Sequence, residues 1–504
     1  MLTATAHRRI FIALLALLAA SMVTSVWMAN LAWVLLGANW LLEGRWREKW
    51  DMARSSRLLQ AYAALYALLL LGMGWTEHTA AGWAVLQVKL PLLVVPLVLL
   101  TTRPVAGTPR KVLAGVYTAA VLVVSVIGLV RMLTIDGLPY REAVPYISHI
   151  RFALNCCMAI YLCAGVMRAA KPLGRVALGA AALWLLVFIM LIRSYTALAV
   201  MAIVPPLVLA GKPGTKPLLA VWLAALATLA GGVAFEAHRY YTMHPLAKEP
   251  QAALTANGRP YIHANDGIVE SGNYVNNYIC TDELRAEWSR RSAVPYDSLQ
   301  PDGYTVQPKL VRYLNALGLT KDSVGVWSLT QPQIADIERG IPNPAYTSHN
   351  PLRKMVCVML FEHEFHTHTH QVRGFTMIQR FELWKATWHI VVRNRMFGVG
   401  TGDVDATLQS DLCQSGSELC GSGKRPHNQY LSLMAALGIV GFASVAAMFL
   451  RALAQRRPSA LMLAWLLTVL VSMLTEDTLD TLAGILFCTF FLAIRPNVRK
   501  PHSA

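Results

Sequence analysis

Apolar runs long enough to cross a lipid bilayer recur along this sequence. A helix needs about 17–25 mostly apolar residues to span the hydrocarbon core. Only 14% of the residues are charged, whereas a soluble domain carries about 25%. The sequence therefore predicts an all-α polytopic membrane protein with about twelve transmembrane helices. The predicted spans are residues 10–27, 28–42, 58–75, 81–101, 112–132, 151–167, 174–192, 195–211, 217–235, 430–450, 458–474 and 479–494.

The first two predicted spans share one apolar stretch, which has two alternatives: two short helices or one long tilted helix. The stretch follows His7-Arg8-Arg9 and resembles the core of a signal peptide. No convincing small-residue cleavage site follows it, so we interpret it as retained. One long helix would put either the later loops or these three basic residues on the wrong side of the membrane, so two helices are favoured.

Lys and Arg concentrate on one side of the predicted membrane. With twelve spans and a cytoplasmic N-terminus, the short cytoplasmic segments carry 21 of the 45 basic residues but only three acids. The loop 236–426 carries equal numbers of basic and acidic residues and would lie outside the cytoplasm. This distribution follows the positive-inside rule. The net charge of +17 therefore reflects topology, and we expect no nucleic-acid partner.

The eight cysteines divide between the spans and the long loop. Those in the spans are expected to pack as small residues; they are Cys156, Cys157, Cys163 and Cys488. An even number in a loop outside the cytoplasm suggests two disulfides. Of the three possible pairings we favour Cys413–Cys420 as a local clasp, with Cys280–Cys357 as a second link.

These features divide the chain into nine spans in residues 1–235, a loop or cap domain in 236–429, and three spans with a cytoplasmic tail in 430–504. Within the loop, helices are expected at Asp282–Ser292, Pro308–Leu317 and Gln331–Arg339.

An amphipathic helix is predicted near the end of the loop. Apolar residues recur at three-to-four spacing from Thr376 to Met396. Trp384 and Trp388 suit a helix lying at the membrane interface, and packing against the loop's own core is equally compatible. The glycine turn that begins at Gly398 does not follow a strand, which excludes a dinucleotide-binding loop.

Five basic residues depart from the positive-inside pattern because they lie at or within the external ends of spans. They are Lys89, Arg131, Arg141, Arg151 and Arg193. Ionisable groups there usually mark a function, although snorkelling to head groups is the alternative for each. Arg193 is the best candidate, because a planar guanidinium beside hydroxyls suits a phosphate. Arg380, on the amphipathic helix, is expected to be partly buried and therefore to need an anionic partner. That partner could be a ligand, or it could be Glu382 or Glu364.

His427 marks the junction between the loop and the next apolar run. It lies in Arg425-Pro426-His427-Asn428-Gln429-Tyr430-Leu431, where water, head groups and hydrocarbon meet. Histidine titrates near neutrality and can take a proton from an acceptor hydroxyl. Arginines that hold a pyrophosphate would stabilise the charge that develops on it. A lone histidine at a helix start is more often structural, so this alternative stays open.

The histidine-rich tract from His363 to His370 suggests a rival kind of site. Such spacing can bind zinc, copper or nickel. The tract lacks the spacing of a catalytic zinc helix, and we interpret it as a solvated polar loop.

The pattern resembles the O-antigen ligase family, which is related to O-antigen polymerases and pilin glycosyl ligases. The resemblance rests on the His427 block, on Arg380 with Trp384 ahead of the glycine turn, and on Arg193 in Arg193-Ser194-Tyr195-Thr196. The span count and the large loop before the last spans also match. The loop is long for a ligase.

The resemblance implies a GT-C-like membrane glycosyltransferase in the bacterial inner membrane, with its active site on the periplasmic face. The donor would be an undecaprenyl-pyrophosphate-linked glycan and the acceptor a sugar hydroxyl on lipid A-core, with inversion and without cofactor or metal. His427 would activate the acceptor. The pyrophosphate would be held by Arg193 and Arg380, with Arg151 and Lys89 as further candidates, and support would come from Asn428, Tyr430 and Trp384. The alternatives are an O-antigen polymerase, a protein O-glycan ligase, or a transporter or metal-responsive membrane protein.

Overall fold

The computed structural model describes residues 2–135, 138–167, 169–210, 214–242, 252–264, 266–300, 303–348, 350–372, 374–453 and 459–494. Within these residues, eight helical segments are long and apolar enough to cross a membrane. Four more apolar helices, Val26–Leu42, Tyr195–Ala210, Ala460–Ser472 and Leu482–Ile494, are shorter. The chain is therefore an all-α, multi-pass membrane protein, as predicted, while the count of twelve spans stays a prediction. Three parts of these predictions lie outside the described residues: the tail at 495–504, the end of the predicted span at residue 211, and the start of another at residue 458.

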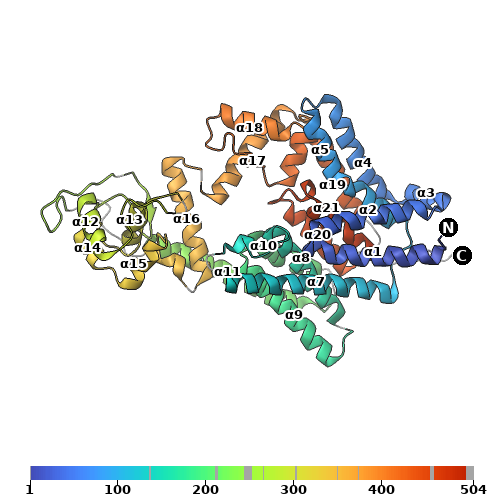
Figure 1. The fold of residues 1–504 in the computed structure, drawn as a ribbon, viewed down its shortest axis with the longest axis horizontal. Coiled ribbons are helices and arrows are strands. Elements are labelled where there is room, and N and C mark those ends of the chain that lie inside the picture. Colours follow the sequence, from blue (N-terminus) through green and yellow to red (C-terminus); the bar gives the residue numbers. More distant parts are fainter. Residues whose placement is uncertain are drawn as a thin grey trace. The chain divides into compact units, whose positions relative to one another are not determined.

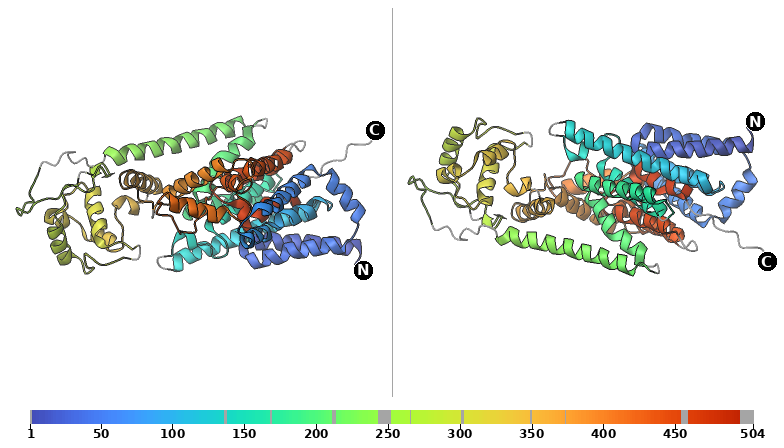
Figure 2. Two further views of the ribbon diagram at one scale, coloured as in Figure 1. Left: turned by 90° about the horizontal axis from the view of Figure 1, so that it is seen from above. Right: turned by 90° about the horizontal axis from the view of Figure 1, so that it is seen from below.

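The chain divides into two compact units (Figure 1). The first comprises Met1–Leu219, Leu383–Gly416 and Cys420–Ala504, and the second comprises Ala220–Glu382 and Ser417–Leu419. Two helices, α11 (Lys216–Thr242) and α17 (Thr376–Arg393), cross from one unit to the other. Figure 2 shows α11 as one uninterrupted helix.

The first unit is a bundle of apolar helices around a core that includes Leu15, Tyr117, Phe152, Trp465 and Phe490. Its helices are α1 (Ala4–Thr24), α2 (Val26–Leu42), α3 (Trp46–Ser55), α4 (Arg57–Leu71), η1 (Gly72–Trp75), α5 (Thr79–Lys89), α6 (Pro91–Leu100), α7 (Gly107–Thr134), η2 (Tyr140–Glu142), α8 (His149–Met167), α9 (Pro172–Leu191), α10 (Tyr195–Ala210), α18 (Val404–Gln414), α19 (Gln429–Leu453), α20 (Ala460–Ser472), η4 (Thr478–Asp480), α21 (Leu482–Phe490) and η5 (Phe491–Ile494).

The N-terminal apolar stretch forms two helices, so the alternative of one long helix is wrong. The chain is extended at Ser25, with φ −165° and ψ 114°. The Ser25 hydroxyl accepts a hydrogen bond from the Met28 N–H and caps α2. The two helices then pack against each other as neighbours.

A glycine turn docks into a break in α19. Gly438 leaves helical geometry at φ 66° and ψ −158°. The Val399 N–H donates to the Ala435 carbonyl at 2.8 Å, and the Gly400 N–H donates to the Ala436 carbonyl at 3.0 Å. A Cβ at Gly398 would lie 2.3 Å from the Ala436 carbonyl carbon, so only glycine permits this approach. The turn therefore fixes the start of α19 to the segment that precedes α18.

The second unit has its own core, built on Leu284, Trp288, Tyr313 and Leu314. Its elements are β1 (Val269–Glu270) paired antiparallel with β2 (Asn273–Tyr274), α12 (Thr281–Arg291), α13 (Val306–Ala316), α14 (Ser323–Trp327), α15 (Gln331–Glu338), η3 (Pro344–Thr347) and α16 (Pro351–Thr369). The three helices expected in this part of the loop are confirmed as α12, α13 and α15. The prediction of a polar loop for the histidine tract is wrong. The tract forms the last turns of α16, and the helix ends at His370, which has φ 58°.

The two disulfide predictions have different outcomes. Cys413 and Cys420 form a disulfide, as predicted. The Cys280–Cys357 pairing is wrong, because both residues are buried free cysteines. Cys280 precedes α12, where its N–H donates to the Lys321 carbonyl at 2.8 Å. Cys357 packs instead in a separate cluster with Tyr240.

The amphipathic helix is confirmed as α17, but its buried face differs from the one expected. Leu383, Thr387 and Ile390 are almost fully buried. Two residues of the predicted apolar stripe, Phe381 and Trp388, are about half exposed, at 55% and 52%. Polar Thr387 faces inward, and its hydroxyl stays satisfied in the core because it donates to the Leu383 carbonyl at 2.6 Å.

Candidate functional site

His427 occupies a strained turn directly ahead of α19. Its φ is 50°, in the left-handed region that few non-glycine residues adopt. Asn428 follows as the helix cap, because its Oδ1 accepts from the N–H groups of Tyr430 and Leu431. The His427 side chain is left 44% exposed. The helix start thus presents the imidazole at the surface of the first unit.

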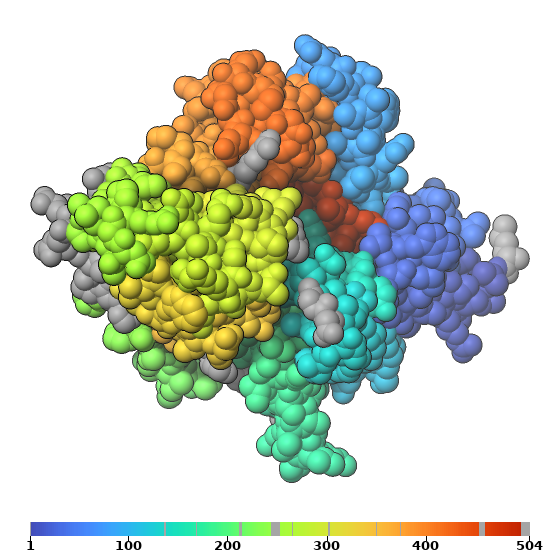
Figure 3. All heavy atoms as spheres, turned by 60° about the vertical axis from the view of Figure 1, so that its left-hand side comes forward, coloured from blue at the N-terminus to red at the C-terminus, as the bar shows by residue number. Residues whose placement is uncertain are grey.

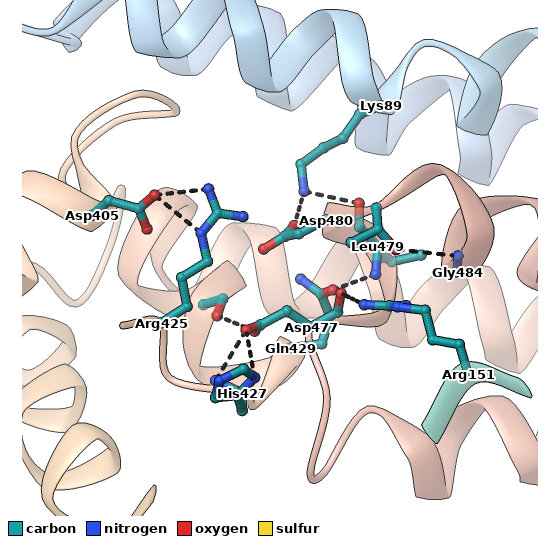
Figure 4. A network of polar contacts seen from close by, with 12 residues as sticks. Lys89, Arg151, Asp405, Arg425, His427, Gln429, Asp477, Leu479, Asp480 and Gly484 are labelled. Carbon is teal, nitrogen blue, oxygen red and sulfur yellow. Dashed lines mark hydrogen bonds and ion pairs between the residues drawn. The ribbon is translucent and has the colours of Figure 1, made fainter. Parts of the chain in front are cut away.

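Asp477 lies against this turn (Figure 4). Its Oδ2 accepts from the His427 N–H at 3.0 Å and lies 3.9 Å from the imidazole Nδ1. Its Oδ1 accepts from the Ser432 hydroxyl at 2.8 Å. Burial, with a smaller contribution from the neighbouring Asp480, raises the pKa of Asp477 to about 6, against the opposing hydrogen bonds. A carboxylate that orients an imidazole is the usual arrangement around a histidine base.

Asp477 is not among the site residues predicted from the sequence. The available signal was the concentration of three acids, Glu476, Asp477 and Asp480, in one short external turn. No sequence pattern links them to the histidine, because Asp477 is 50 residues from His427 along the chain.

Further contacts brace the His427 turn from two sides. The Gln429 N–H donates to the Met473 carbonyl at 2.9 Å, and the Gln429 side chain accepts from the Leu479 N–H. On the other side the Trp384 indole donates to the Pro426 carbonyl at 2.7 Å. The predicted supporting residues Trp384 and Asn428 therefore contact the turn itself.

Tyr430, the third predicted supporting residue, is an anchor for α19. Its hydroxyl donates to the Leu470 carbonyl at 2.9 Å, and its ring meets Phe442 edge to face. It holds α19 to α20 rather than pointing at His427.

Lys89 and Arg151 both reach the turn that carries Asp477 (Figure 4). Pro91 ends α5, so Lys89 falls in the last turn of that helix, in the middle of the predicted span. Its ammonium pairs with Asp480 and donates to the Leu479 carbonyl at 3.2 Å. Only 6% of Lys89 is exposed, so it does not snorkel. Arg151 donates to the Asp477 carbonyl at 3.2 Å.

Arg193 lies in a strained turn between α9 and α10. It adopts φ 51°, so Arg193 and His427 are two of the six non-glycine residues with positive φ in the described part of the chain. Such strain concentrates at functional sites. Thr196, in the first turn of α10, shares a 2.8 Å hydrogen bond with Thr475, which brings the start of this helix to the turn that carries Asp477. Arg193 is exposed, lies over the Tyr140 ring at 5.1 Å, and forms no ion pair with any described carboxylate.

Arg380 is half-buried on α17 and belongs to the second unit, so its role stays a prediction. The two weaker candidates, Arg131 and Arg141, contact η2 (Tyr140–Glu142): Arg131 donates to the Glu142 carbonyl, and Arg141 donates to the Tyr140 hydroxyl.

A cavity of about 410 Å³ adjoins the His427 turn. Its walls come from α5, residues 401–406 and the start of α19. In Figure 3 the orange surface that includes residues 383–416 meets the light-blue region of α4 and α5. Pro426 and Gln429 line the cavity, whereas His427 lies outside its lining. The polar residues that line it are His78, Lys89, Thr401, Asp405, Arg425, Gln429, Ser432 and Asp480.

The charged groups of this cavity are paired with one another. Arg425 donates to Asp405 from Nε at 3.1 Å and from Nη2 at 2.8 Å. The Lys89 ammonium pairs with Asp480. Asp403 fixes the cavity wall by accepting from the N–H groups of Glu77 and His78, each at 2.8 Å. An entering anion would therefore have to displace a carboxylate.

The histidine tract provides no comparable site. The His366 ring faces the Gln371 carbonyl at 3.0 Å, and His368 faces Glu364 at 3.8 Å. No group of three or more metal-binding side chains occurs in the described ranges.

A comparison with protein families was informative for one region of the chain. The family described as O-antigen ligase matches residues 347–446. Over these residues, about a fifth of the chain, the protein is similar to that family. The matched region contains Arg380, Trp384, the glycine turn and His427, whereas Arg193 and Asp477 lie beyond it. No curated protein matches the chain.

Proposed function

We propose that this protein belongs to the O-antigen ligase family and transfers a glycan from undecaprenyl pyrophosphate to a sugar hydroxyl of lipid A-core. The reaction would occur at the periplasmic face of the bacterial inner membrane, without cofactor or metal. The observation that carries the proposal is the pairing of His427, exposed on a strained turn, with the buried carboxylate of Asp477. This pairing fits the chemistry that the similarity to the family supports in general terms.

In the proposed reaction His427 takes the proton of the acceptor hydroxyl. The acceptor oxygen then forms a bond to the anomeric carbon as the bond from that carbon to the pyrophosphate oxygen breaks. Attack from the face opposite the leaving group inverts the anomeric configuration. Undecaprenyl pyrophosphate leaves with the electron pair of the broken bond, and the proton is released from His427 to solvent.

Asp477 would act as a positioning residue. Its carboxylate holds the His427 N–H at 3.0 Å and lies 3.9 Å from Nδ1. A small rotation of the imidazole would shorten the second distance when the ring becomes protonated, and catalytic hydrogen bonds often tighten only with substrate bound. The carboxylate would then stabilise the imidazolium.

Arg193 is the proposed main ligand for the pyrophosphate. Its guanidinium is exposed, is not paired with a described carboxylate, and has the planar geometry that binds two phosphate oxygens. Arg380 remains a proposed second ligand. Since Lys89 pairs with Asp480 and Arg151 donates to the Asp477 carbonyl, we propose that these two chiefly position the acidic turn.

The decisive experiment is transfer in vitro from purified lipid-linked glycan to purified lipid A-core. His427→Ala should reduce transfer by at least about 10²-fold, the usual minimum for loss of a general base. His389→Ala is a matched control, because His389 is 51% exposed and its Nδ1 lies 3.6 Å from the Asp411 carboxylate. Equal activity of the two variants would refute the proposed base. Loss of activity with a chelator would refute metal-free transfer.

The same assay separates the ligase from a polymerase or a protein ligase. A second lipid-linked repeat, or a protein, replaces lipid A-core as the acceptor. Transfer to lipid A-core alone supports the ligase, and transfer only to another acceptor refutes it while leaving the proposed donor and base in place.

A further inference from the structure

A second cavity lies at the opposite end of the first unit's helices from His427. Its volume is about 880 Å³, and its lining includes Ser56, at the start of α4, and Leu100, at the end of α6. The other end of α4 leads to Gly72, whose carbonyl accepts from the Thr401 N–H beside the first cavity. Ser56 and Gly72 are 16 residues apart, which corresponds to about 24 Å at 1.5 Å per residue of helix. The second cavity is therefore a separate site.

Positive charge exceeds negative charge in this cavity. Its lining contains four cations, Arg8, Arg45, Lys49 and Arg103, and two carboxylates, Glu43 and Glu48. Glu43 lies 3.1 Å from the Lys49 ammonium and 3.9 Å from Arg45, while Glu48 contacts both Arg45 and Arg103. Because each carboxylate is shared between two cations, two positive charges remain uncompensated. An anion of charge −1 or −2 would balance them.

Polar donors in the lining also lack an anionic partner. The Arg8 guanidinium donates to the carbonyls of Arg103 and Pro104, at 2.7 and 3.0 Å, and forms no ion pair with a described carboxylate. The Thr102 hydroxyl is buried and has no hydrogen-bond partner among the described residues. A buried hydroxyl without a partner costs about 1–3 kcal/mol, which a bound acceptor would recover. An oxygen-rich anion would meet both requirements.

Helix α3 indicates where such an anion comes from. It forms part of the cavity wall close to the N-terminus (Figure 1). Trp46 and Trp50 on this helix are 54% and 58% exposed, and Arg54 lies over the Trp50 ring at 4.8 Å. Exposed tryptophans beside basic residues are typical of helices at the level of lipid head groups. The exposed indoles therefore favour a lipid phosphate, because a soluble anion would gain nothing from contact with them.

We propose that this cavity binds the phosphate head group of an anionic membrane lipid, held chiefly by Arg8, Arg45 and Arg103. Basic pockets between membrane helices recognise lipid phosphates in this way. The positive-inside pattern predicts that the site faces the cytoplasm, away from the proposed transfer reaction. We assign Lys49 a structural role, because its ammonium is buried, pairs with Glu43 and donates to the Trp40 carbonyl.

The test uses the full-length purified protein in phosphatidylcholine nanodiscs. Phosphatidylglycerol or cardiolipin is titrated in, thermal melting is followed, and retained lipid is counted by native mass spectrometry. Anionic lipid should raise the melting temperature in a saturable manner. Arg45→Gln with Arg103→Gln should weaken this response at least tenfold. Arg110→Gln with Lys111→Gln is the matched control, because these cations begin α7 nearby but do not line the cavity.

Three results would overturn the proposal: no difference between anionic and neutral lipid, equal loss in the control pair, or full stabilisation by inorganic phosphate alone. The last would assign the cavity to a soluble anion instead. If the double variant melts abnormally in neutral lipid, Arg103→Gln alone keeps the test valid, because this side chain is 74% exposed and its loss leaves the packing intact.

Discussion

Replacing Asp477 by Asn should make the protein more stable and less active. Asp477 is almost fully buried, and burial beside Asp480 raises the pKa of its carboxyl from 3.8 to about 6. At pH 7.5 the folded protein therefore holds a carboxylate in an environment that favours the neutral form. Asn is neutral at every pH, has the same shape, and keeps one oxygen to accept from Ser432 or from the His427 N–H.

The size of the stabilisation follows from the pKa. A shift of one unit corresponds to about 1.36 kcal/mol, so the change from 3.8 to about 6 amounts to on the order of 2–3 kcal/mol. Unfolding entropy of about 2.1 cal/mol/K per residue gives about 1 kcal/mol/K for 504 residues, so the melting temperature should rise by about 2–3 °C.

The pH dependence identifies the cause. Because the folded pKa is raised, the contribution of the protonated carboxyl is fully present below about pH 4 and is lost as the pH rises through about 6. Melting in detergent at several pH values should therefore show the advantage of Asp477→Asn at pH 7.5 and its decline below pH 6. In transfer assays at saturating donor, kcat should fall by about 10²-fold with little change in KM, since the imidazole loses its oriented partner.

Two outcomes would refute this reasoning. A lower melting temperature for Asp477→Asn at pH 7.5 would mean that the ionised carboxylate stabilises the fold through Ser432 and Arg425. Unchanged kcat would mean that the 3.9 Å approach to His427 has no catalytic consequence. Ser432→Ala, which removes one hydrogen bond to the carboxylate but not the charge, serves as the control and should lower stability slightly.

Three further predictions concern the supports of the site. Arg193→Lys should restore little of the transfer lost in Arg193→Gln, because an ammonium cannot hold two phosphate oxygens at once; the KM for donor reports this, and full activity of the Lys variant would contradict it. Trp384→Phe removes the hydrogen bond to the Pro426 carbonyl, so the free energy of unfolding should fall by about 1 kcal/mol. The kcat should fall more than the KM rises. An unchanged melting temperature would argue against this hydrogen bond. Gly398→Ala should prevent folding, as judged by gel filtration. Gly416→Ala should be tolerated, because Gly416 has a similar φ of 68° but nothing lies within 4 Å of the added Cβ. Equal behaviour of the two variants would exclude the proposed clash.

The helical architecture could be predicted from local pattern. Each predicted span coincides with an apolar helix or helix pair, and α12, α13, α15 and α17 were also expected. Period and length decide such elements from residues close together in the chain. The face of α17 that is buried could not be predicted in this way, because it depends on what packs against the helix. The same limit explains the error at Cys280 and Cys357, whose separation in space no spacing rule reveals.

The sequence by itself determined that the chain is a multi-pass helical protein, that charge is distributed unequally along it, and that His427 stands at a junction. Only the tertiary structure decided what surrounds His427: the Asp477 carboxylate from 50 residues away, the Trp384 indole on Pro426, and the left-handed φ of the residue itself. It also separated cations that are already paired, such as Lys89, from Arg193. The physical reason is range: hydrophobic periodicity acts over a few turns of helix, whereas hydrogen bonds and burial depend on which distant segments the fold brings together.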